Sequence, residues 1–199
     1  MLNLLIIIGF SYLLGSIPFS FLVAKSMGKI DIREHGSKNA GATNVYRVLG
    51  AKAGIIALAS DISKGIIATL VAKYFFGFDM ALVAGASVIV GHCFPFALGF
   101  KGGKGVATGV GTIIGLFPSI AGILFLVMLA IVLTTEYVAL GSVICALLFP
   151  LFGLVFKMPA TFYFYSIPAS LFVIYRHKAN IKRLLNGTEN KTKLIKARK

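Results

Sequence analysis

The stretch 106-VATGVGTIIGLFPSIAGILFLVMLAIVLTT-135 decides the fold of this chain. A helix that crosses a membrane needs about 20 mostly apolar residues, so a run of about 30 is too long for one straight span and short for two. Pro118 lies near the middle of the run, and a proline interrupts helical hydrogen bonding. The stretch therefore forms either one long helix or two short helices that meet at Pro118.

The rest of the chain is also rich in segments long enough to cross a membrane. Of its 199 residues, 58% are hydrophobic and 13% are charged, whereas a soluble globular domain is about half apolar and about a quarter charged. This composition excludes a soluble domain, a disordered chain and a basic soluble nucleic-acid binder. The other predicted spans are Leu2–Ala24, Gly54–Phe78, Ala81–Phe100, Val138–Phe156 and Ala160–Tyr175.

The positive charges decide between the two arrangements of the stretch around Pro118. The chain has 20 Lys and Arg against 6 Asp and Glu, and cytoplasmic segments of membrane proteins carry the excess of Lys and Arg. Two short helices give seven spans, with the N-terminus outside and the C-terminus cytoplasmic, and place 17 of the 20 positive residues inside. One long helix would put the positive residues of the tail opposite those of the first loop. We therefore predict an all-α membrane protein with seven spans.

Seven spans leave little chain for anything else, so residues 1–199 are predicted to form a single polytopic membrane domain. The cytoplasmic segments are the loops 25–52 and 101–106 and the tail 176–199. None of them is long enough to form its own core. The Lys-rich end of the tail, 191–199, is predicted to lie in solvent near anionic lipid. Any chemistry must therefore use the cytoplasmic helix ends and these segments.

The first loop contains 35-HGSKNAGATNVYR-47, which is dense in small polar side chains and glycines. Such a segment lets backbone amides approach a ligand closely. Arg47 adds a guanidinium that is able to grip a phosphate with two hydrogen bonds. An ordinary polar loop with turn glycines is the alternative. The candidate substrate-binding residues are Ser37, Asn39, Thr43, Asn44 and Arg47.

The second loop, 99-GFKGGKGVATGVG-111, is a glycine-rich turn that leads into an apolar helix. Backbone amides at such a helix N-terminus favour an anion. The loop is not a nucleotide-binding P-loop, because that motif needs a glycine at 98 and Ser or Thr at 105. We predict a phosphate cradle, with a flexible, closely packed turn as the alternative. Its candidate residues are Gly102, Gly103, Lys104 and Gly105.

The tail opens with 175-YRHKANIKRLLNGTE-189, which predicts a short interfacial helix. His177 and Asn180 are three residues apart and share one face of a helix. A basic helix that only anchors the chain is the alternative. Within the spans, Lys64 and Ser142 are candidates from their position near the cytoplasmic side. Asp61 is three residues from Lys64, so an ion pair along one helix explains both residues equally well.

The cytoplasmic segments combine cations and glycines with few carboxylates, which suits phosphate-bearing ligands. The His, Asp and Glu residues show no metal-ligand spacing, and acidic partners for a Ser-His-Asp triad are scarce. We therefore predict no metal and no cofactor. The residue pattern alone leaves open an enzyme, a transporter of phosphorylated small molecules and a structural membrane protein.

Several motifs together resemble the PlsY family, the bacterial acyl-phosphate:glycerol-3-phosphate acyltransferases. The motifs are 15-GSIPFS-20, Gly36–Arg47, 91-GHCFP-95, 100-FKGGKGVAT-108 and 176-RHKANIKRLLNGTE-189, and they run in order over essentially the whole chain. Lys38 departs from the pattern, which more often has glycine there. The joint occurrence of the motifs is highly specific, although each glycine motif alone is weak.

The resemblance implies an acyl-CoA-independent acyltransferase in phospholipid biosynthesis. The 1-hydroxyl of sn-glycerol 3-phosphate attacks the acyl carbon of a long-chain acyl phosphate, and the products are lysophosphatidic acid and phosphate. The enzyme would be a multi-pass protein of the bacterial cytoplasmic (inner) membrane, with its active site facing the cytoplasm. Its partners would be these two substrates and membrane lipids, with no nucleic acid and no required protein partner.

The resemblance also implies roles for the candidate residues. Lys104, His177 and Asn180 are the expected catalytic residues, and Glu189 organises the tail. The first-loop residues line the substrate pocket, with Arg47 on a phosphate. The second loop, 99–111, which we call the glycine loop, holds the second phosphate. Either His177 or a phosphate oxygen of the substrate takes the hydroxyl proton.

Overall fold

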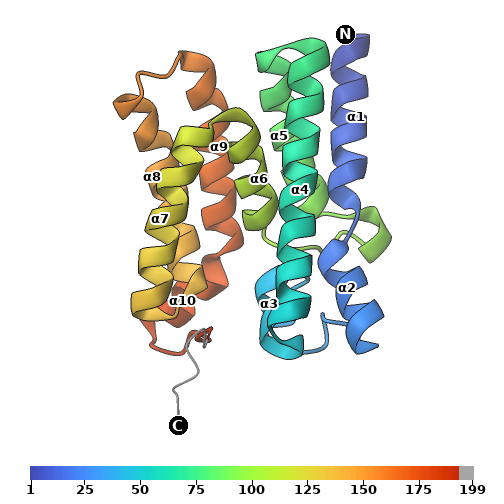
Figure 1. Ribbon diagram of the computed structural model, residues 1–199, viewed down its shortest axis with the longest axis vertical. Coiled ribbons are helices and arrows are strands. Elements are labelled where there is room, and N and C mark those ends of the chain that lie inside the picture. Colours follow the sequence, from blue (N-terminus) through green and yellow to red (C-terminus); the bar gives the residue numbers. More distant parts are fainter. Residues whose placement is uncertain (193–199) are drawn as a thin grey trace. The chain divides into compact units, whose positions relative to one another are not determined.

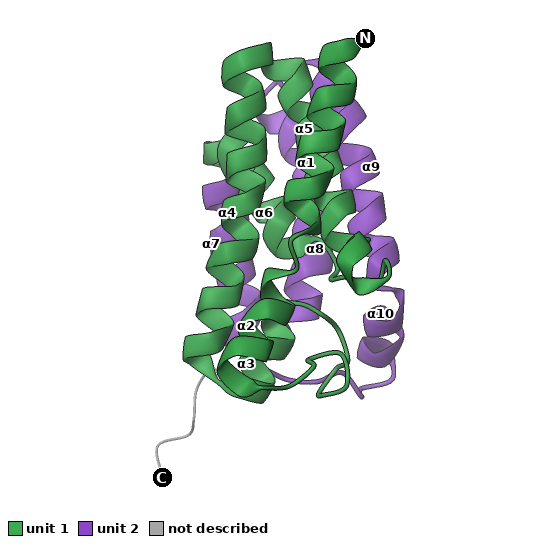
Figure 2. Cartoon of the chain, turned by 90° about the vertical axis from the view of Figure 1, so that its right-hand side faces the viewer, with its two compact units in different colours: residues 1–119 green, residues 120–199 purple. Residues whose placement is uncertain are grey.

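The structure is a computed structural model that describes residues 1–192 and is helical throughout that range, without strands. The chain divides into two compact units, Met1–Ser119 and Ile120–Lys199 (Figure 2). Figure 1 labels the ten α-helices. The elements are α1 (Leu2–Ser16), α2 (Phe19–Gly28), α3 (Ala42–Leu49), α4 (Ala51–Phe76), α5 (Phe78–Cys93), the 3-10 helix η1 (Phe96–Leu98), α6 (Val106–Leu116), α7 (Pro118–Thr135), α8 (Val138–Val155), α9 (Ala160–Arg176) and α10 (Lys178–Leu185).

Five helical segments are long and apolar enough to cross a membrane: Leu2–Gly28, Ala51–Phe76, Phe78–Leu98, Pro118–Thr135 and Val138–Val155. Helix α6 is a shorter apolar helix of 11 residues, and α9 has 17 residues. The prediction of an all-α chain with several membrane spans is confirmed. The number of seven spans and the orientation of the two termini stay predictions. The Lys-rich end of the tail from residue 193 on lies outside the described residues.

The stretch around Pro118 is broken where the sequence predicted it. Helix α6 ends at Leu116, the Phe117 backbone leaves the helical region, and Pro118 is the first residue of α7. The first position of a helix suits proline, because the N–H that proline lacks has no intrahelical partner there. The two pieces differ in length, with 11 residues in α6 and 18 in α7.

The predicted span Leu2–Ala24 lies within the apolar helical segment Leu2–Gly28, and the chain breaks inside that segment between α1 and α2. Pro18 has no N–H to continue the helical ladder, so carbonyl groups at the end of α1 need other donors. The Lys64 ammonium of α4 supplies them, with Nζ 2.9 Å from the Gly15 oxygen and 3.1 Å from the Ile17 oxygen. The break in the first span is thus closed by a buried charge from another helix.

The predicted span Ala81–Phe100 agrees closely with the helical segment Phe78–Leu98, but this segment is not one regular helix. Helix α5 stops at Cys93, and Pro95 is followed by the single turn η1. The residue before a proline is disfavoured in the helical region, and Phe94 has φ of −130°. The chain therefore turns before the glycine loop instead of entering it from a helix.

Close helix contacts in residues 1–119 depend on glycines that face neighbouring backbones. A Cβ built at Gly15 of α1 or Gly91 of α5 would overlap a carbonyl oxygen of the other helix. The same holds for Gly65 of α4 and Gly111 of α6. Small residues are what allow membrane helices to approach this closely. Helix α4 therefore lies against α6, while α1 lies against α5 (Figure 1).

The second unit is built on aromatic packing between α8 and α9. The Phe149 ring packs edge-to-face on Phe162, with ring centroids 5.2 Å apart, and on Tyr165 at 6.2 Å. The tail after α10 returns to the turn between α7 and α8, where the Thr192 N–H donates to the Glu136 carbonyl oxygen over 2.8 Å. This contact fixes the path of the described tail.

Candidate active site

The first loop is built around the buried side chain of Asn44. Its Nδ2 donates to the carbonyl oxygens of Ile32, His35 and Asn39 at 2.9 to 3.1 Å. Its Oδ1 accepts from the Ser37 N–H over 2.8 Å. The side-chain amide of Asn44 therefore holds the first loop against α3. These bonds give Asn44 a loop-shaping position, and its predicted contact with substrate stays a prediction.

Two neighbouring positions in the segment 35–47 of this loop have left-handed backbone conformations. Gly36 has φ of 57° and Lys38 has φ of 58°. A side chain makes this conformation unfavourable by roughly 1–2 kcal/mol, which glycine avoids. The geometry explains why position 38 suits glycine. Lys38 is exposed, so its side chain adds a positive charge at the surface. Its left-handed backbone makes the turn less favourable than it would be with glycine.

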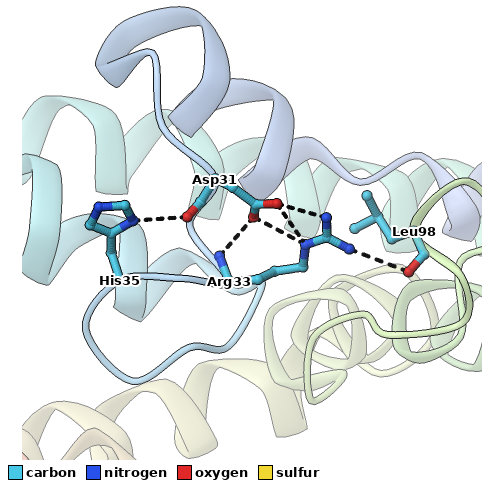
Figure 3. Close-up of polar contacts among 4 residues, drawn as sticks. All are labelled: Asp31, Arg33, His35 and Leu98. Carbon is cyan, nitrogen blue, oxygen red and sulfur yellow. Dashed lines mark hydrogen bonds and ion pairs between the residues drawn. The ribbon is translucent and has the colours of Figure 1, made fainter.

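Asp31 and Arg33 link the first loop to the segment before the glycine loop (Figure 3). The Arg33 guanidinium donates to both carboxylate oxygens of Asp31, the shortest contact being 2.7 Å, and its Nη1 lies 3.4 Å from the Leu98 carbonyl oxygen. Hydrogen bonding from Arg33 lowers the pKa of Asp31, and the same bond raises the pKa of Arg33. The sequence analysis did not single out either residue. An Asp and an Arg two residues apart in a loop nevertheless indicate a local ion pair.

The glycine loop runs back along the end of α5. The Gly102 N–H donates to the Cys93 carbonyl oxygen at 3.1 Å, and the Gly103 N–H donates to the His92 carbonyl oxygen at 3.2 Å. A Cβ at Gly102 would overlap the His92 carbonyl, and one at Gly103 would overlap the His92 ring. These two glycines are therefore required by packing, and their amides are engaged by α5. Their predicted role in binding a phosphate stays a prediction.

The part of the loop suited to an anion is its end, Lys104, Gly105 and the first turn of α6. Gly105 has φ of 86° and precedes Val106, the first residue of α6. The first amides of a helix have no intrahelical acceptors and lie at the positive end of its dipole. Lys104 is half-buried beside them. This end of the loop keeps the cation, the glycine turn and the helix N-terminus that the sequence indicated.

The two loops lie next to each other within residues 1–119. A small open cavity is lined by Ala40 of the first loop and by Gly102 and Gly103 of the second. Ala40 also packs in one hydrophobic cluster with Leu98. The structure thus brings part of the first loop next to Gly102 and Gly103 of the second loop.

Lys64 is fully buried and makes an interior ion pair. Its Nζ lies 3.0 Å from Asp61 Oδ1 and near the two carbonyl oxygens at the end of α1. An ammonium has three N–H donors, and these three oxygens match them. The pairing of Asp61 with Lys64 is as the spacing indicated. The predicted binding of a substrate phosphate by Lys64 stays a prediction.

In the second unit, His177 is the residue between α9 and α10, and it is buried. Its Nδ1 lies 2.8 Å from the Val173 carbonyl oxygen. A carbonyl oxygen only accepts, so Nδ1 carries a proton in this contact. In the neutral ring Nε2 is then the basic nitrogen, and in the charged ring it is a donor.

Asn180 is held by the buried carboxylate of Glu189. The Asn180 Nδ2 donates to Glu189 Oε1 at 2.9 Å, and the Arg183 Nε donates to Oε2 at 2.8 Å. These bonds fix which way the Asn180 amide points and tie the tail to α10. The contacts fit the expected role of Glu189 in organising the tail. Arg183 is a further member of this network that sequence reasoning did not single out.

The remaining candidate residues fall into the same two units. Ser142 is buried in α8, and its hydroxyl donates to the Val138 carbonyl oxygen at 2.8 Å. Ser37, Asn39, Thr43 and Arg47 are all half-buried in the first unit. Among residues 1–192, no three His, Cys, Asp or Glu side chains are grouped to hold a metal ion.

Known proteins match this chain over nearly its whole length. Residues 5–187 match the family model described as glycerol-3-phosphate acyltransferase. The glycerol-3-phosphate acyltransferase of Thermoanaerobacter pseudethanolicus is 42% identical over 181 residues, which is 91% of each chain. That of Halalkalibacterium halodurans is 42% identical over 197 residues, covering 96% of this chain and 95% of the relative.

Solved structures agree with the sequence matches. The crystal structure of PlsY, an integral membrane glycerol 3-phosphate acyltransferase, in its glycerol 3-phosphate form has a TM-score of 0.90 at 43% identity, covering 94% of both chains. Its lysophosphatidic acid form has a TM-score of 0.88 at 42% identity over the same shares. These matches identify an integral membrane acyltransferase. The chain belongs to the glycerol-3-phosphate acyltransferase family that includes PlsY.

Proposed function

We propose that the chain transfers a long-chain acyl group from acyl phosphate to the 1-hydroxyl of sn-glycerol 3-phosphate, without acyl-CoA. The products are lysophosphatidic acid and phosphate, at an early step of phospholipid biosynthesis. The observation that carries the proposal is the close match to PlsY structures whose two forms are described by glycerol 3-phosphate and lysophosphatidic acid. The structures in this family name glycerol 3-phosphate and lysophosphatidic acid, which fit the acceptor and the product of the proposed reaction. The acyl phosphate donor is our proposal.

The chemistry of the loops supports an acyl phosphate donor. This mixed anhydride has phosphate as a good leaving group, so the enzyme mainly has to hold two anions close together and stabilise charge in the transition state. Lys104, Arg47 and the α6 N-terminus provide positive charge for that task. In the reaction the hydroxyl oxygen bonds to the acyl carbon, and the bond from that carbon to the phosphate oxygen breaks.

The hydroxyl proton needs an acceptor, and we propose that a phosphate oxygen of the substrate takes it. His177 then binds a substrate oxygen through Nε2, held in place by its Nδ1 bond to Val173. The variant His177→Gln is expected to lower turnover without shifting the pH profile. Loss of the acidic limb of the pH profile in this variant would make His177 the base instead, because a base is inactivated by protonation at low pH.

We also propose seven spans, with the N-terminus outside and the active site facing the cytoplasm of the bacterial inner membrane. Five helical segments are long and apolar enough to cross a membrane, and in this proposal α6 and α9 are the other two spans. The excess of Lys and Arg in the first loop, the glycine loop and the tail supports this orientation. All the proposed site residues then lie at or near one face of the membrane.

The test uses purified protein and two lysines of the same loop. Wild-type protein given acyl phosphate and glycerol 3-phosphate should release phosphate in a reaction that depends on glycerol 3-phosphate. Lys104→Ala should lose most turnover, whereas Lys101→Ala, at an exposed position, should stay near wild type. Equal rates in the two variants would contradict the proposed site. Uptake of glycerol 3-phosphate into liposomes without phosphate release would favour the transporter.

A further inference from the structure

A buried polar cluster lies beneath the glycine loop, in the interior of residues 1–119. Asp61 of α4 is its centre. The Ser20 hydroxyl donates to Asp61 Oδ2 at 2.7 Å, Lys64 Nζ lies 3.0 Å from Oδ1, and His92 Nδ1 lies 3.4 Å from the same oxygen. All four side chains are at most 7% exposed. The cluster joins α2, α4 and α5.

Such a cluster is costly in an apolar helical bundle. Buried charges must be paired and hydrogen-bonded, and ionisable groups inside membrane proteins usually serve function. The Asp61–Lys64 pair already has a structural purpose, because Lys64 donates to the carbonyl groups at the break after α1. That purpose does not involve His92, so His92 needs a separate explanation.

His92 contacts the glycine loop through two different parts of the residue. Its carbonyl oxygen accepts the Gly103 N–H at 3.2 Å. Its ring packs on Gly103 so closely that a Cβ there would overlap Nε2. The small cavity between cluster and loop is lined by Ser20, Asp61, His92, Gly102 and Gly103. The ring therefore spans from the Asp61 carboxylate to the residue just before Lys104.

We propose that His92, oriented by Asp61, is a positioning residue that sets the Gly103–Lys104 backbone for acyl transfer. The proposal rests on the proposed function, because Lys104 is its catalytic lysine. The carboxylate fixes the ring through Nδ1, and the ring supports the loop at its Nε2 edge. Group transfer is sensitive to such support, since a displacement of about 1 Å can cost about a hundredfold in rate.

Two amide substitutions separate the two contacts of the ring. In His92→Asn the amide nitrogen occupies the place of Nδ1, so the contact with Asp61 is kept while the support at Gly103 is lost. In His92→Gln the amide nitrogen occupies the place of Nε2, so the side chain still reaches Gly103. We expect His92→Asn to lower kcat by about tenfold or more, with KM for both substrates and the thermal midpoint near wild type. His92→Gln should retain more kcat than His92→Asn.

A second pair of variants tests the same contact from the loop. Gly103→Ala should lower kcat, because its methyl group meets the His92 ring, and adding His92→Asn should restore part of it. Gly102→Ala is the matched control, since its methyl group meets the His92 carbonyl group, which no side-chain change removes. Rescue at position 103 and none at position 102 supports the proposal.

The proposal is overturned if His92→Asn turns over like wild type, or if Gly103→Ala and His92→Asn combine additively. Wild-type lysophosphatidic acid synthesis in the same assay separates this proposal from the proposed function. Wild-type protein without synthesis contradicts the function itself. Active wild type with unaffected variants contradicts only the positioning role of His92.

Discussion

Replacing Glu189 with glutamine should loosen the tail and lower activity. The Glu189 side chain is 2% exposed and accepts from both Asn180 and Arg183. A glutamine has one carbonyl oxygen, so it is able to accept from only one of them and turns its NH₂ group toward the other. A hydrogen bond to a charged group is worth about 1.5–3 kcal/mol, and Arg183 is 36% exposed, which screens its share. We expect a loss of about 2 kcal/mol in the free energy of unfolding.

The matched control is Glu136→Gln in the same unit. Glu136 also faces a cation, with its Oε2 3.4 Å from Lys191 Nζ, but its side chain is 32% exposed and that of Lys191 is 52% exposed. Exposed ion pairs are worth about 0–1 kcal/mol, so this variant should be near wild type. Both substitutions remove one negative charge. The two variants therefore differ in how buried the replaced carboxylate is and in whether it accepts a hydrogen bond from Asn180.

The assay combines thermal unfolding in detergent, followed by circular dichroism, with turnover. A loss of 2 kcal/mol corresponds to a fall of about 4–8 °C in the thermal midpoint for a chain of this size. Glu189→Gln should also lose about tenfold or more in kcat, because Asn180 is no longer held. The reasoning is refuted if the two glutamine variants have the same midpoint and turnover.

Three further predictions concern the first loop. Asn44→Ala should lower the free energy of unfolding by about 2–3 kcal/mol, because it leaves three carbonyl groups and one N–H without their partner, and the thermal midpoint measures this. Lys38→Gly should be more stable than Lys38→Ala by about 1 kcal/mol, because both lack the charge and only glycine relieves the left-handed backbone. The Asp31–Arg33 pair lowers the Asp31 pKa, so its stabilisation is full above the unfolded pKa of about 4 and lost as pH falls through the lower folded value. The midpoint difference between wild type and Asp31→Asn should therefore vanish at low pH; a difference that persists there would contradict the pairing.

The sequence predicted the parts of the fold that follow from hydropathy and one proline. The break at Pro118 was inferred because charge counting required a second helix there. Pro18 has the same physical effect, but hydropathy runs continuously through it and no charge count depends on it. The break was therefore missed, together with the role of Lys64 in closing it.

For the candidate site, the sequence likewise predicted some features and not others. Loop composition located the segments, and residue type alone did not separate a ligand contact from a contact within the protein. The substrate contacts of Asn44 and Gly103 stay predictions, and the structure adds that Asn44 shapes the first loop and that Gly103 packs on His92. These roles depend on residues distant in sequence, such as Ile32 for Asn44. A single sequence carries no direct record of such pairs.

The measurement that tests the central claim most directly is the initial rate of lysophosphatidic acid formation by the purified wild-type protein. The acceptor is glycerol 3-phosphate, and the donors compared are acyl phosphate, acyl-CoA and acyl carrier protein carrying the same chain. Mass spectrometry of the product reports the acylated position. We predict 1-acyl-glycerol 3-phosphate from acyl phosphate, with matching phosphate release, and none from the other two donors. Formation from acyl-CoA or acyl carrier protein, but not from acyl phosphate, would contradict the account.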